Sequence, residues 1–488
     1  MIGGGSQVPY PHLYVVPAEG AHASMQAMKI EFHGADRGVT GSCHLIECAG
    51  KRLVIDCGLY QGGRELDEEN AEGFGFEPAA IDFVLLTHAH LDHCGRLPLL
   101  VKRGFRGEIV TTDASRELLR LVLLDAAHLH EEEALRRSRH MPRREAQGVV
   151  SPLYTIADAL HTMDFVGLAA RYGVPQRLAP GITATFVDAG HILGSASILL
   201  ELAEGGVRRR VLFSGDLGNV GRPLLRAAPP PPTADAVVME STYGDRLHKP
   251  IAASIEELYE ALGDALQRGG NVVIPSFALE RTQELLFVLR TGIESGRLPS
   301  GIQVFLDSPM AISATEIFAR YPQYYQDETR ELFRQGRDPF GLPGLHLTRE
   351  TSDSVALNRI TGGAIIIAGS GMCSGGRVRH HLKHNLGRHN CAVIFVGYAG
   401  RGTLARRIID GAQSVSLFGE EIAVRARIHT INGFSAHADQ AELLRWHAAT
   451  RAARTFLVHG EPEVMQMLAA RLPGTAVEMP CLHQQYPL

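Results

Sequence analysis

Residues 85–95, LLTHAHLDHCG, place three histidines and one aspartate within six positions directly after an apolar run. Core packing offers no reason to concentrate imidazoles and a carboxylate at the end of a strand. Zinc, in contrast, prefers imidazole nitrogen and carboxylate oxygen as ligands, and loops anchored by rigid strands hold such ligands best. The stretch therefore predicts a metal site at the end of a buried strand.

Further ligands are expected at comparable positions elsewhere in the chain. His191, Asp216 and His459 each follow an apolar run and precede a glycine within a few residues, so each side chain is expected at the mouth of a loop. Asp56, in VIDCG, has the same setting but is open to two interpretations. It is either a ligand itself or a group that hydrogen-bonds a ligand or the loop.

The length of 488 residues exceeds what one hydrophobic core usually fills, so we expect two domains. Short β runs, including a hairpin turning at residues 49–51, and a long helix over residues 114–144 precede the proline run AAPPPPT at residues 227–233. We take this run as a domain boundary. Beyond it, β-branched runs with helical segments between them predict a parallel sheet, beginning with the strand AVVMES.

Charge and cysteine usage exclude some classes of protein. Lys and Arg number 48 against 53 Asp and Glu, and this net charge of −5 gives no overall basic field for nucleic acid, so any such contact must be local. Seven cysteines without a CxxC pair argue against a disulfide framework and favour a reducing, cytoplasmic setting. No apolar run is long enough to cross a bilayer, so we expect no membrane association. Residues 1–27 are predicted to be a flexible extension.

The segments THAHLDHCG, DAGHILGSAS and SGDLG resemble the metal-binding motifs of the metallo-β-lactamase superfamily. The resemblance covers nearly the whole chain from Met28 and implies an α/β fold, the αββα sandwich. It also implies two zinc ions per chain, with manganese or iron as possible replacements. One ion would be held by His88, His90 and His191, the other by Asp92, His93 and His459, with Asp216 as the bridge.

The segments MESTYGDR, VVIPSFALERTQELL, IIIAGSGMCSGGRVRHHL and INGFSAHADQ resemble the β-CASP branch of this superfamily, whose members process nucleic acids. Glu240 matches the acidic motif, taken to follow the first inserted strand, and His437 and His459 match the two later histidine motifs. A histidine at the last position goes with members that act on RNA. The chain is therefore similar to the compact bacterial form of these RNA-processing nucleases, without the extra C-terminal domain of ribonuclease J.

The resemblance implies a ribonuclease that cleaves single-stranded RNA in the cleft between two domains. A phosphodiester held across two zinc ions would be neutralised, and a water between them would be acidified toward hydroxide for in-line attack. His437 is the expected general acid, kept protonated and oriented by Glu240. The expected catalytic set is therefore Asp92, Asp216, Glu240 and His437, in which the two aspartates act through the metals.

Contacts to the RNA backbone are expected from His437, Ser435, Arg281 and Arg377, because hydroxyls and guanidinium groups bind phosphate oxygens without reading sequence. The expected domain limits are residues 28–230 and 431–488 for the metallo-β-lactamase domain and residues 231–430 for the β-CASP domain. A homodimer is left open.

Two alternatives remain. The same metal core serves hydrolases of thioesters and lactams, although such a substrate does not explain Glu240, His437 and the large insertion. The other alternative is a catalytically silent RNA-binding relative, against which the complete set of ligand motifs argues.

Overall fold

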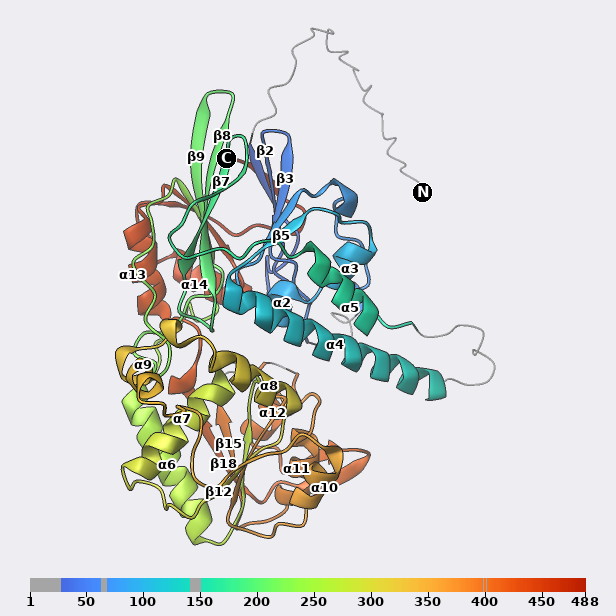
Figure 1. The fold of residues 1–488 in the computed structure, drawn as a ribbon, viewed down its shortest axis with the longest axis vertical. Helices are drawn as coiled ribbons and strands as arrows, with labels where there is room; N and C mark the ends of the chain where they lie inside the picture. The colour runs from blue at the N-terminus through green and yellow to red at the C-terminus, as the bar shows by residue number, and fades with distance from the viewer. Residues whose placement is uncertain (1–27, 63–67, 141–150, 398, 401) are drawn as a thin grey trace, which may run out of the picture.

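The computed structural model describes residues 28–62, 68–140, 151–397, 399–400 and 402–488. The extension predicted for residues 1–27 lies outside these ranges. Figure 1 shows two parts, with two sheets and helices α2–α5, α13 and α14 in the upper part of the view and a third sheet with helices α6–α12 in the lower part.

The first sheet has six strands in the order β21-β1-β2-β3-β4-β5. The predicted hairpin joins β2 to β3, and its turn residues Ala49 and Gly50 have φ values of 50° and 71°, the positive values that a type I′ turn requires. The hairpin prediction is confirmed. The strands are β1 (Lys29–Phe32), β2 (His44–Cys48), β3 (Lys51–Ile55), β4 (Phe83–Leu85), β5 (Glu108–Val110) and β21 (Gln485–Pro487).

The second sheet has seven strands in the order β20-β19-β10-β9-β8-β7-β6. Its inner face packs against the first sheet, and Ile30 and Phe32 of the first sheet share one buried cluster with Phe186, Phe213 and Phe456 of the second. The strands are β6 (Gln176–Ala179), β7 (Ile182–Asp188), β8 (Ala196–Glu204), β9 (Val207–Phe213), β10 (Ala236–Glu240), β19 (Arg454–Val458) and β20 (Ala476–Glu478).

Helices cover the outer face of each of these sheets. On the first sheet, Val54 and Val84 belong to the same buried cluster as Leu100 and Leu119 of the covering helices. On the second sheet, a separate buried cluster joins the strands to two late helices. The resulting αββα sandwich confirms the predicted fold class. The helices are α2 (Leu91–Cys94), α3 (Leu97–Lys102), α4 (Asp113–His140) and α5 (Ile156–Thr162) on the first sheet, and α13 (Gln440–Thr450) and α14 (Pro462–Ala469) on the second.

The third sheet has six strands in the order β13-β12-β14-β11-β15-β18, and every pairing in it is parallel. Its central strands are buried along their whole length, as expected for a parallel sheet covered on both faces. The predicted parallel sheet is thereby confirmed. The strands are β11 (Val272–Pro275), β12 (Gln303–Leu306), β13 (Leu345–Leu347), β14 (Ala364–Ala368), β15 (Ala392–Val396) and β18 (Arg427–Ile431).

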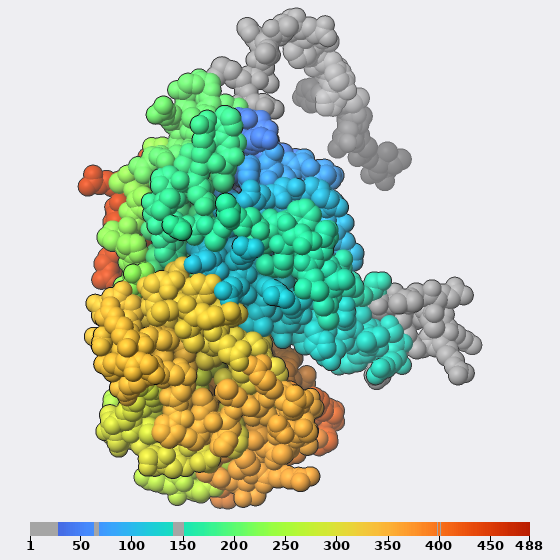
Figure 2. Space-filling model, in the orientation of Figure 1, coloured from blue at the N-terminus to red at the C-terminus, as the bar shows by residue number. Residues whose placement is uncertain are grey.

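Helices surround this sheet, and a small antiparallel pair, β16 (Ser414–Leu417) and β17 (Glu420–Ala423), stands beside it. Helix α8 packs against α4 of the sandwich, where Figure 2 shows the two parts meeting. The helices are α6 (Ile251–Gln267), α7 (Arg281–Glu294), α8 (Pro309–Phe318), α9 (Asp327–Arg334), α10 (Thr351–Leu357), α11 (Val378–Asn385) and α12 (Leu404–Ile409).

One strand assignment made from the sequence is wrong. AVVMES was expected to begin the inserted sheet after the proline run, but it forms β10 in the seven-stranded sheet, paired in parallel with β9 and β19. Adjacent parallel strands need a long crossover, and the proline run lies in the crossover that joins β9 to β10. The run therefore interrupts regular structure without separating two domains. The other domain limits stay predictions.

Neither disulfide bonds nor membrane-spanning helices occur in the part of the chain that the structure describes. All seven cysteines are free thiols, and six of them are buried. No described helix combines the length and the apolar character that crossing a bilayer requires.

Candidate metal centre

The loop that follows β4 carries four of the predicted metal ligands. His90 is the N-cap of the short helix α2 and has an extended backbone, with φ −71° and ψ 148°. His88 precedes this change of backbone direction, whereas Asp92 and His93 lie within the helix. The change from extended to helical backbone separates the four side chains into two pairs.

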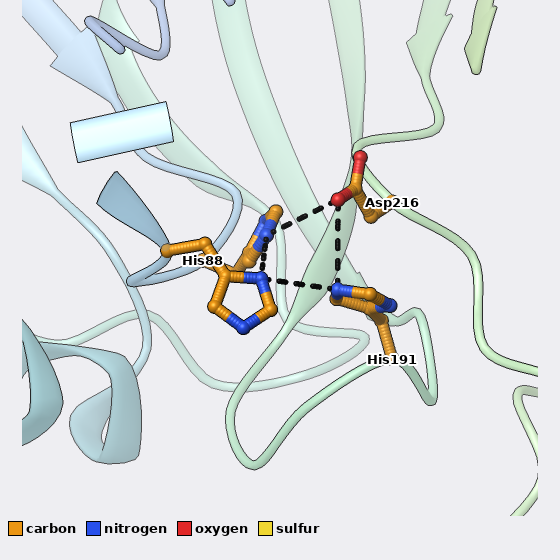
Figure 3. Close-up of side chains that lie close together, drawn as sticks. His88, His191 and Asp216 are labelled. Atoms are coloured by element: carbon orange, nitrogen blue, oxygen red, sulfur yellow. Dashed lines mark hydrogen bonds and ion pairs between the residues drawn. The ribbon is translucent and has the colours of Figure 1, made fainter. Parts of the chain in front are cut away.

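The first pair meets two residues from distant loops. His90 Nδ1 lies 3.1 Å from His88 Nε2 and 3.2 Å from His191 Nε2. Asp216 Oδ2 lies 3.5 Å from the Nε2 atoms of both His88 and His191. Figure 3 shows His88, His191 and Asp216 pointing toward one another from separate segments of the chain. We call His88, His90, His191 and Asp216 the first donor group; one ligand atom from each lies within 4.8 Å of the others.

The second pair meets His459, from the loop after β19. His459 Nε2 lies 3.4 Å from Asp92 Oδ2, and His93 Nε2 lies 4.0 Å from the same oxygen. We call Asp92, His93 and His459 the second donor group; their ligand atoms also lie within 4.8 Å of one another. The structure thus brings together all seven residues predicted as metal ligands.

Asp216 stands between the two donor groups. Its Oδ2 faces the first group, while its Oδ1 lies 3.3 Å from His93 Nε2 and 3.7 Å from His459 Nδ1. Both Asp216 Oδ1 and His93 Nε2 are buried, and neither makes a hydrogen bond within the part of the chain that the structure describes. Buried polar atoms are normally satisfied, and facing donors of this kind are satisfied by a cation. The residues therefore fit two divalent metal ions.

The protonation of the histidines agrees with this fit. Burial lowers the pKa of His90 to about 3 and also lowers that of His88, so both rings are neutral and offer a lone pair to a metal. His93 differs, because the carboxylates of Asp216 and Asp56 overcome the effect of burial and raise its pKa well above the usual value. The two carboxylates lie at opposite ring nitrogens of His93, so a cation bound at Nε2, beside Asp216, would take the place of the proton there.

Asp56 lies behind the ligands and outside both donor groups. Its Oδ2 lies 2.7 Å from His93 Nδ1, and its two oxygens accept hydrogen bonds from Thr87 N at 2.7 Å and Thr87 Oγ1 at 2.8 Å. The Thr87 hydroxyl also lies 3.0 Å from His88 Nδ1. One carboxylate and one hydroxyl thereby hold two imidazole rings in orientation.

Sequence reasoning missed Thr87 and a second residue of the same kind. Thr242 Oγ1 lies 3.0 Å from His459 Nδ1 and holds that ring from the side away from Asp92. A single threonine carries no sequence signal of its own. Thr87 stands directly before the histidine cluster, and this position is the one hint that the sequence offered.

His437 and Glu240 form a pair beside the first donor group. His437 Nδ1 lies 3.2 Å from Glu240 Oε2 and 3.9 Å from Asp216 Oδ2, and its ring centre is 4.6 Å from that of His191. Glu240 is buried and accepts a hydrogen bond of 2.6 Å from Leu217 N, whereas the His437 side chain is 21% exposed. Burial alone lowers the pKa of His437, but Glu240 and then Asp216 raise it to about 9.

The residues predicted to contact RNA lie in different settings. Ser435 is buried, and its Oγ accepts a hydrogen bond of 3.3 Å from His437 N. Arg281 is also buried, with its guanidinium ion-paired to Glu284. Arg377 Nη1 lies 2.7 Å from the buried Asp307 carboxylate. Among the described residues, neither arginine hydrogen-bonds or ion-pairs with a donor group, and their role toward RNA stays a prediction.

A buried arginine, also missed from the sequence, joins the inserted part to the metal loops. Arg222 Nε lies 2.6 Å from Glu284 Oε1, and its Nη2 lies 3.0 Å from Glu280 Oε1. The same guanidinium donates from Nη1 to the backbone oxygen of His191 at 2.6 Å, and Glu280 accepts from Leu193 N at 3.2 Å. Two carboxylates at the start of α7 thus support the loop that carries a metal ligand.

Family models match three successive stretches of the chain. Residues 36–276 match the metallo-beta-lactamase superfamily, and residues 282–408 match the Beta-Casp domain. Residues 421–480 match a domain described as the Zn-dependent metallo-hydrolase RNA specificity domain. The three matches cover all the elements that carry the two donor groups and the His437–Glu240 pair.

Curated relatives match over most of the chain. Ribonuclease TTHA0252 of Thermus thermophilus is 41% identical over 445 residues, which are 91% of this chain and 96% of the relative. Transcription termination factor FttA of Pyrococcus horikoshii is 33% identical, covering 90% of this chain and 67% of the relative. The protein of the same name from Methanocaldococcus jannaschii is 30% identical, covering 89% and 67%.

A solved structure shares the fold at low sequence identity. It is a crystal structure of a protein of unknown function from Enterococcus faecalis V583, with a TM-score of 0.52, 12% identity, and coverage of 95% of this chain and 100% of that one. The fold, the family models and the Thermus relative together show that the chain belongs to the β-CASP branch of the metallo-β-lactamase superfamily.

Proposed function

We propose that this chain is a two-zinc ribonuclease that hydrolyses phosphodiester bonds of single-stranded RNA. The observation that carries the proposal is the position of Asp216, whose two oxygens face different donor groups while the His437–Glu240 pair lies beside them. The names of the relatives favour RNA as the substrate, since one is a ribonuclease and others are transcription termination factors. The RNA specificity domain matched at residues 421–480 includes His437 and His459.

The donor groups define where the two ions would bind. The histidines of the first group would hold one ion, the second group would hold the other, and Asp216 would lie between them. Bound there, divalent cations supply positive charge that neutralises a phosphodiester and acidifies a water molecule for attack. The nitrogen and oxygen donors would also accept manganese or iron.

His437 is the proposed proton donor to the leaving 3′-oxygen. Its Nδ1 is engaged with Glu240, so Nε2 carries the proton that is available for transfer. The Glu240 carboxylate is fixed by the Leu217 N–H and favours the protonated ring, which keeps the acid ready for each turnover. Ser435 holds the backbone of His437 in place.

A substrate panel combined with elemental analysis tests the proposal. Purified protein of measured metal content is incubated with single-stranded RNA, the same sequence as DNA, duplex RNA, a chromogenic lactam and a thioester. We expect cleavage of single-stranded RNA, its loss after chelation, and its return on adding Zn²⁺. The Asp216→Ala variant, purified in parallel, controls for contaminating nucleases.

Two results would overturn the proposal. Fully metallated protein that leaves RNA intact but opens the lactam or the thioester is a hydrolase of another class. Fully metallated protein that binds RNA tightly and turns over no member of the panel is a catalytically silent RNA-binding protein.

A further inference from the structure

A third group of metal-suited side chains joins the first strand to the end of the chain. Glu31 and His33 lie two positions apart at the end of β1, and His483 lies just before β21. Strand β21 pairs with β1, with Gln485 opposite Glu31, and His483 N donates a hydrogen bond of 2.7 Å to Phe32 O. Backbone pairing therefore fixes the relative positions of three side chains that are about 450 residues apart in sequence.

The strand period determines which way these side chains face. Ile30 and Phe32 point into the core between the two sheets of the sandwich. Successive residues of a strand point to opposite faces, so Glu31 and His33 share the other face of the first sheet. His33 meets Phe76 there, with ring centres 4.9 Å apart.

The ligand atoms of the three residues converge. His33 Nδ1 lies 3.1 Å from His483 Nδ1, and His33 Nε2 lies 3.3 Å from Glu31 Oε1. One ligand atom from each residue lies within 4.8 Å of the other two. Two nitrogens on one tetrahedral zinc ion are about 3.3 Å apart, so the spacing of the histidines suits such an ion.

A hydrogen bond from a neighbouring side chain fixes the orientation of the Glu31 carboxylate. Glu31 Oε2 accepts a hydrogen bond of 2.6 Å from Gln485 Nε2, which leaves Oε1 directed toward His33. His33 is buried, and among the described residues its Nε2 makes no hydrogen bond, with Glu31 Oε1 3.3 Å away. Glu31 Oε1 faces this nitrogen and His483 lies at the other ring nitrogen of His33, so a cation would engage His33 through one nitrogen, within reach of one ligand atom each from Glu31 and His483.

The backbone of Gly75 lies directly against the two imidazole rings. Gly75 has φ +75°, and a Cβ at this position would lie 2.3 Å from His483 Cε1 and 2.8 Å from His33 Nδ1. A side chain at Gly75 would therefore displace the histidines. Burial, and then the neighbouring His483, lower the pKa of His33 to about 4, so the ring is neutral, as a metal ligand must be.

We propose that Glu31, His33 and His483 bind a divalent transition-metal ion of the zinc class, separate from the two donor groups of the metal centre. His483 is exposed, so water would complete the coordination of such an ion. Such an ion would fasten the C-terminal strand to β1, because its ligands come from both segments. Its role is structural, and RNA cleavage does not depend on it.

Metal stoichiometry tests the inference. Chelator-treated wild type and the His483→Ala variant are titrated with Zn²⁺ and with Co²⁺, and bound metal is measured by elemental analysis after gel filtration. We expect the variant to bind one equivalent per chain fewer than wild type, whatever number the metal centre takes up. The rise in Tm that Zn²⁺ causes should be smaller in the variant.

Two further variants sharpen the comparison. His128→Ala replaces another exposed histidine, on α4, and should bind as much metal as wild type. Glu31→Gln should also lose one equivalent, because an amide oxygen is a weaker ligand than a carboxylate. Equal stoichiometry in wild type, His483→Ala and Glu31→Gln would overturn the inference. RNA cleavage by His483→Ala is measured separately, so failure of the proposed ribonuclease activity leaves this test intact.

Discussion

Arg222 donates a hydrogen bond of 2.6 Å to the backbone oxygen of His191, a member of the first donor group. The other arms of the guanidinium are ion-paired with Glu280 and Glu284, both at the start of α7 in the inserted part. Arginine suits this role because its planar fork binds several oxygens at fixed angles. The position of His191, a candidate metal ligand in the sandwich, is thus coupled to the packing of the inserted part.

Replacing Arg222 tests this coupling. Arg222→Lys retains the charge but loses the fork, so we expect zinc affinity to fall by about 10- to 100-fold, as for other residues that orient metal ligands. Arg222→Ala removes the ion-pair partner of the buried Glu280 and one of the two arginines paired with Glu284, and should destabilise the fold by about 3–5 kcal/mol. Competitive zinc titration and urea unfolding measure the two effects.

Arg226→Ala, at a nearby exposed arginine, is the matched control. Zinc affinity of Arg222→Lys equal to that of wild type would contradict the coupling.

His437→Ala should keep both metals and lose RNA cleavage. Loss of a general acid typically costs about 10²- to 10⁴-fold in rate, and His437 belongs to neither donor group. A nitrophenyl phosphodiester has a leaving group that needs no proton, so its hydrolysis should fall much less. Parallel kinetics on RNA and on this ester, with metal analysis, provide the check. An equal loss on both substrates would show that His437 does not act as the acid.

The pH dependence of RNA cleavage should reflect the Glu240–His437 pair. His437 acts in its protonated form, and Glu240 with Asp216 raises its pKa to about 9 against the effect of burial. Activity should therefore persist at neutral pH and fall as the pH rises through the pKa of His437. Glu240→Gln removes the charge and should move this alkaline limb to lower pH.

Asp245→Asn, at a neighbouring carboxylate paired with Arg246, should leave the limb in place. An unmoved limb in Glu240→Gln would exclude this role for Glu240.

Asp216 and Asp92 should differ in how many ions their loss removes. Asp216 faces both donor groups, so Asp216→Ala should lose both metals and all activity. Asp92 faces the second group alone, so Asp92→Ala should lose one equivalent and keep the other. Elemental analysis of the purified variants distinguishes the outcomes. Retention of two equivalents in Asp216→Ala would contradict a bridging role.

The ionised carboxylate of Asp307 should stabilise the inserted part of the fold, and this stabilisation should be lost at acidic pH. It is buried between His381 Nε2 at 2.6 Å, Arg377 Nη1 at 2.7 Å and Ser354 Oγ at 2.6 Å. Burial raises its pKa, but these hydrogen bonds outweigh burial and lower it below the usual value. A lowered pKa gives stability that is present above the unfolded-state pKa and is lost as the pH falls below it.

The Asp307→Asn variant measures this contribution. We expect the free energy of unfolding to decrease by about 3–5 kcal/mol at neutral pH, because Arg377 loses its carboxylate partner and His381 loses a hydrogen-bond acceptor. The difference from wild type should shrink as the pH falls below about 4, where the carboxylate of the unfolded chain is protonated. Asp353→Asn, at an exposed carboxylate of α10, should have no such effect. A difference that stays constant down to pH 3 would mean that the charge of Asp307 contributes nothing.

The sandwich fold, the inserted parallel sheet and the convergence of the seven candidate metal ligands could be predicted because their signals are local. His88, His90, Asp92 and His93 lie within six positions, and each distant ligand follows an apolar strand and precedes a glycine. Strand ends in such folds lie at one edge of a sheet, so position along the chain indicates position in space. The same reasoning failed for β10. The packing of the whole sheet determines which strands pair in parallel with β10, and the neighbouring proline run does not indicate them.

By itself, the sequence determined which side chains could bind metal and which strands would carry them, since both depend on residue type and short-range spacing. Only the tertiary structure decided which polar groups lie beside these side chains. Arg281 and Arg377, expected at the RNA, are ion-paired with Glu284 and Asp307. The contact of Arg222 with the loop of His191, and that of His33 with His483, join residues far apart in the chain. Such contacts arise from packing of whole elements, and no local pattern encodes a partner that the chain reaches only after folding.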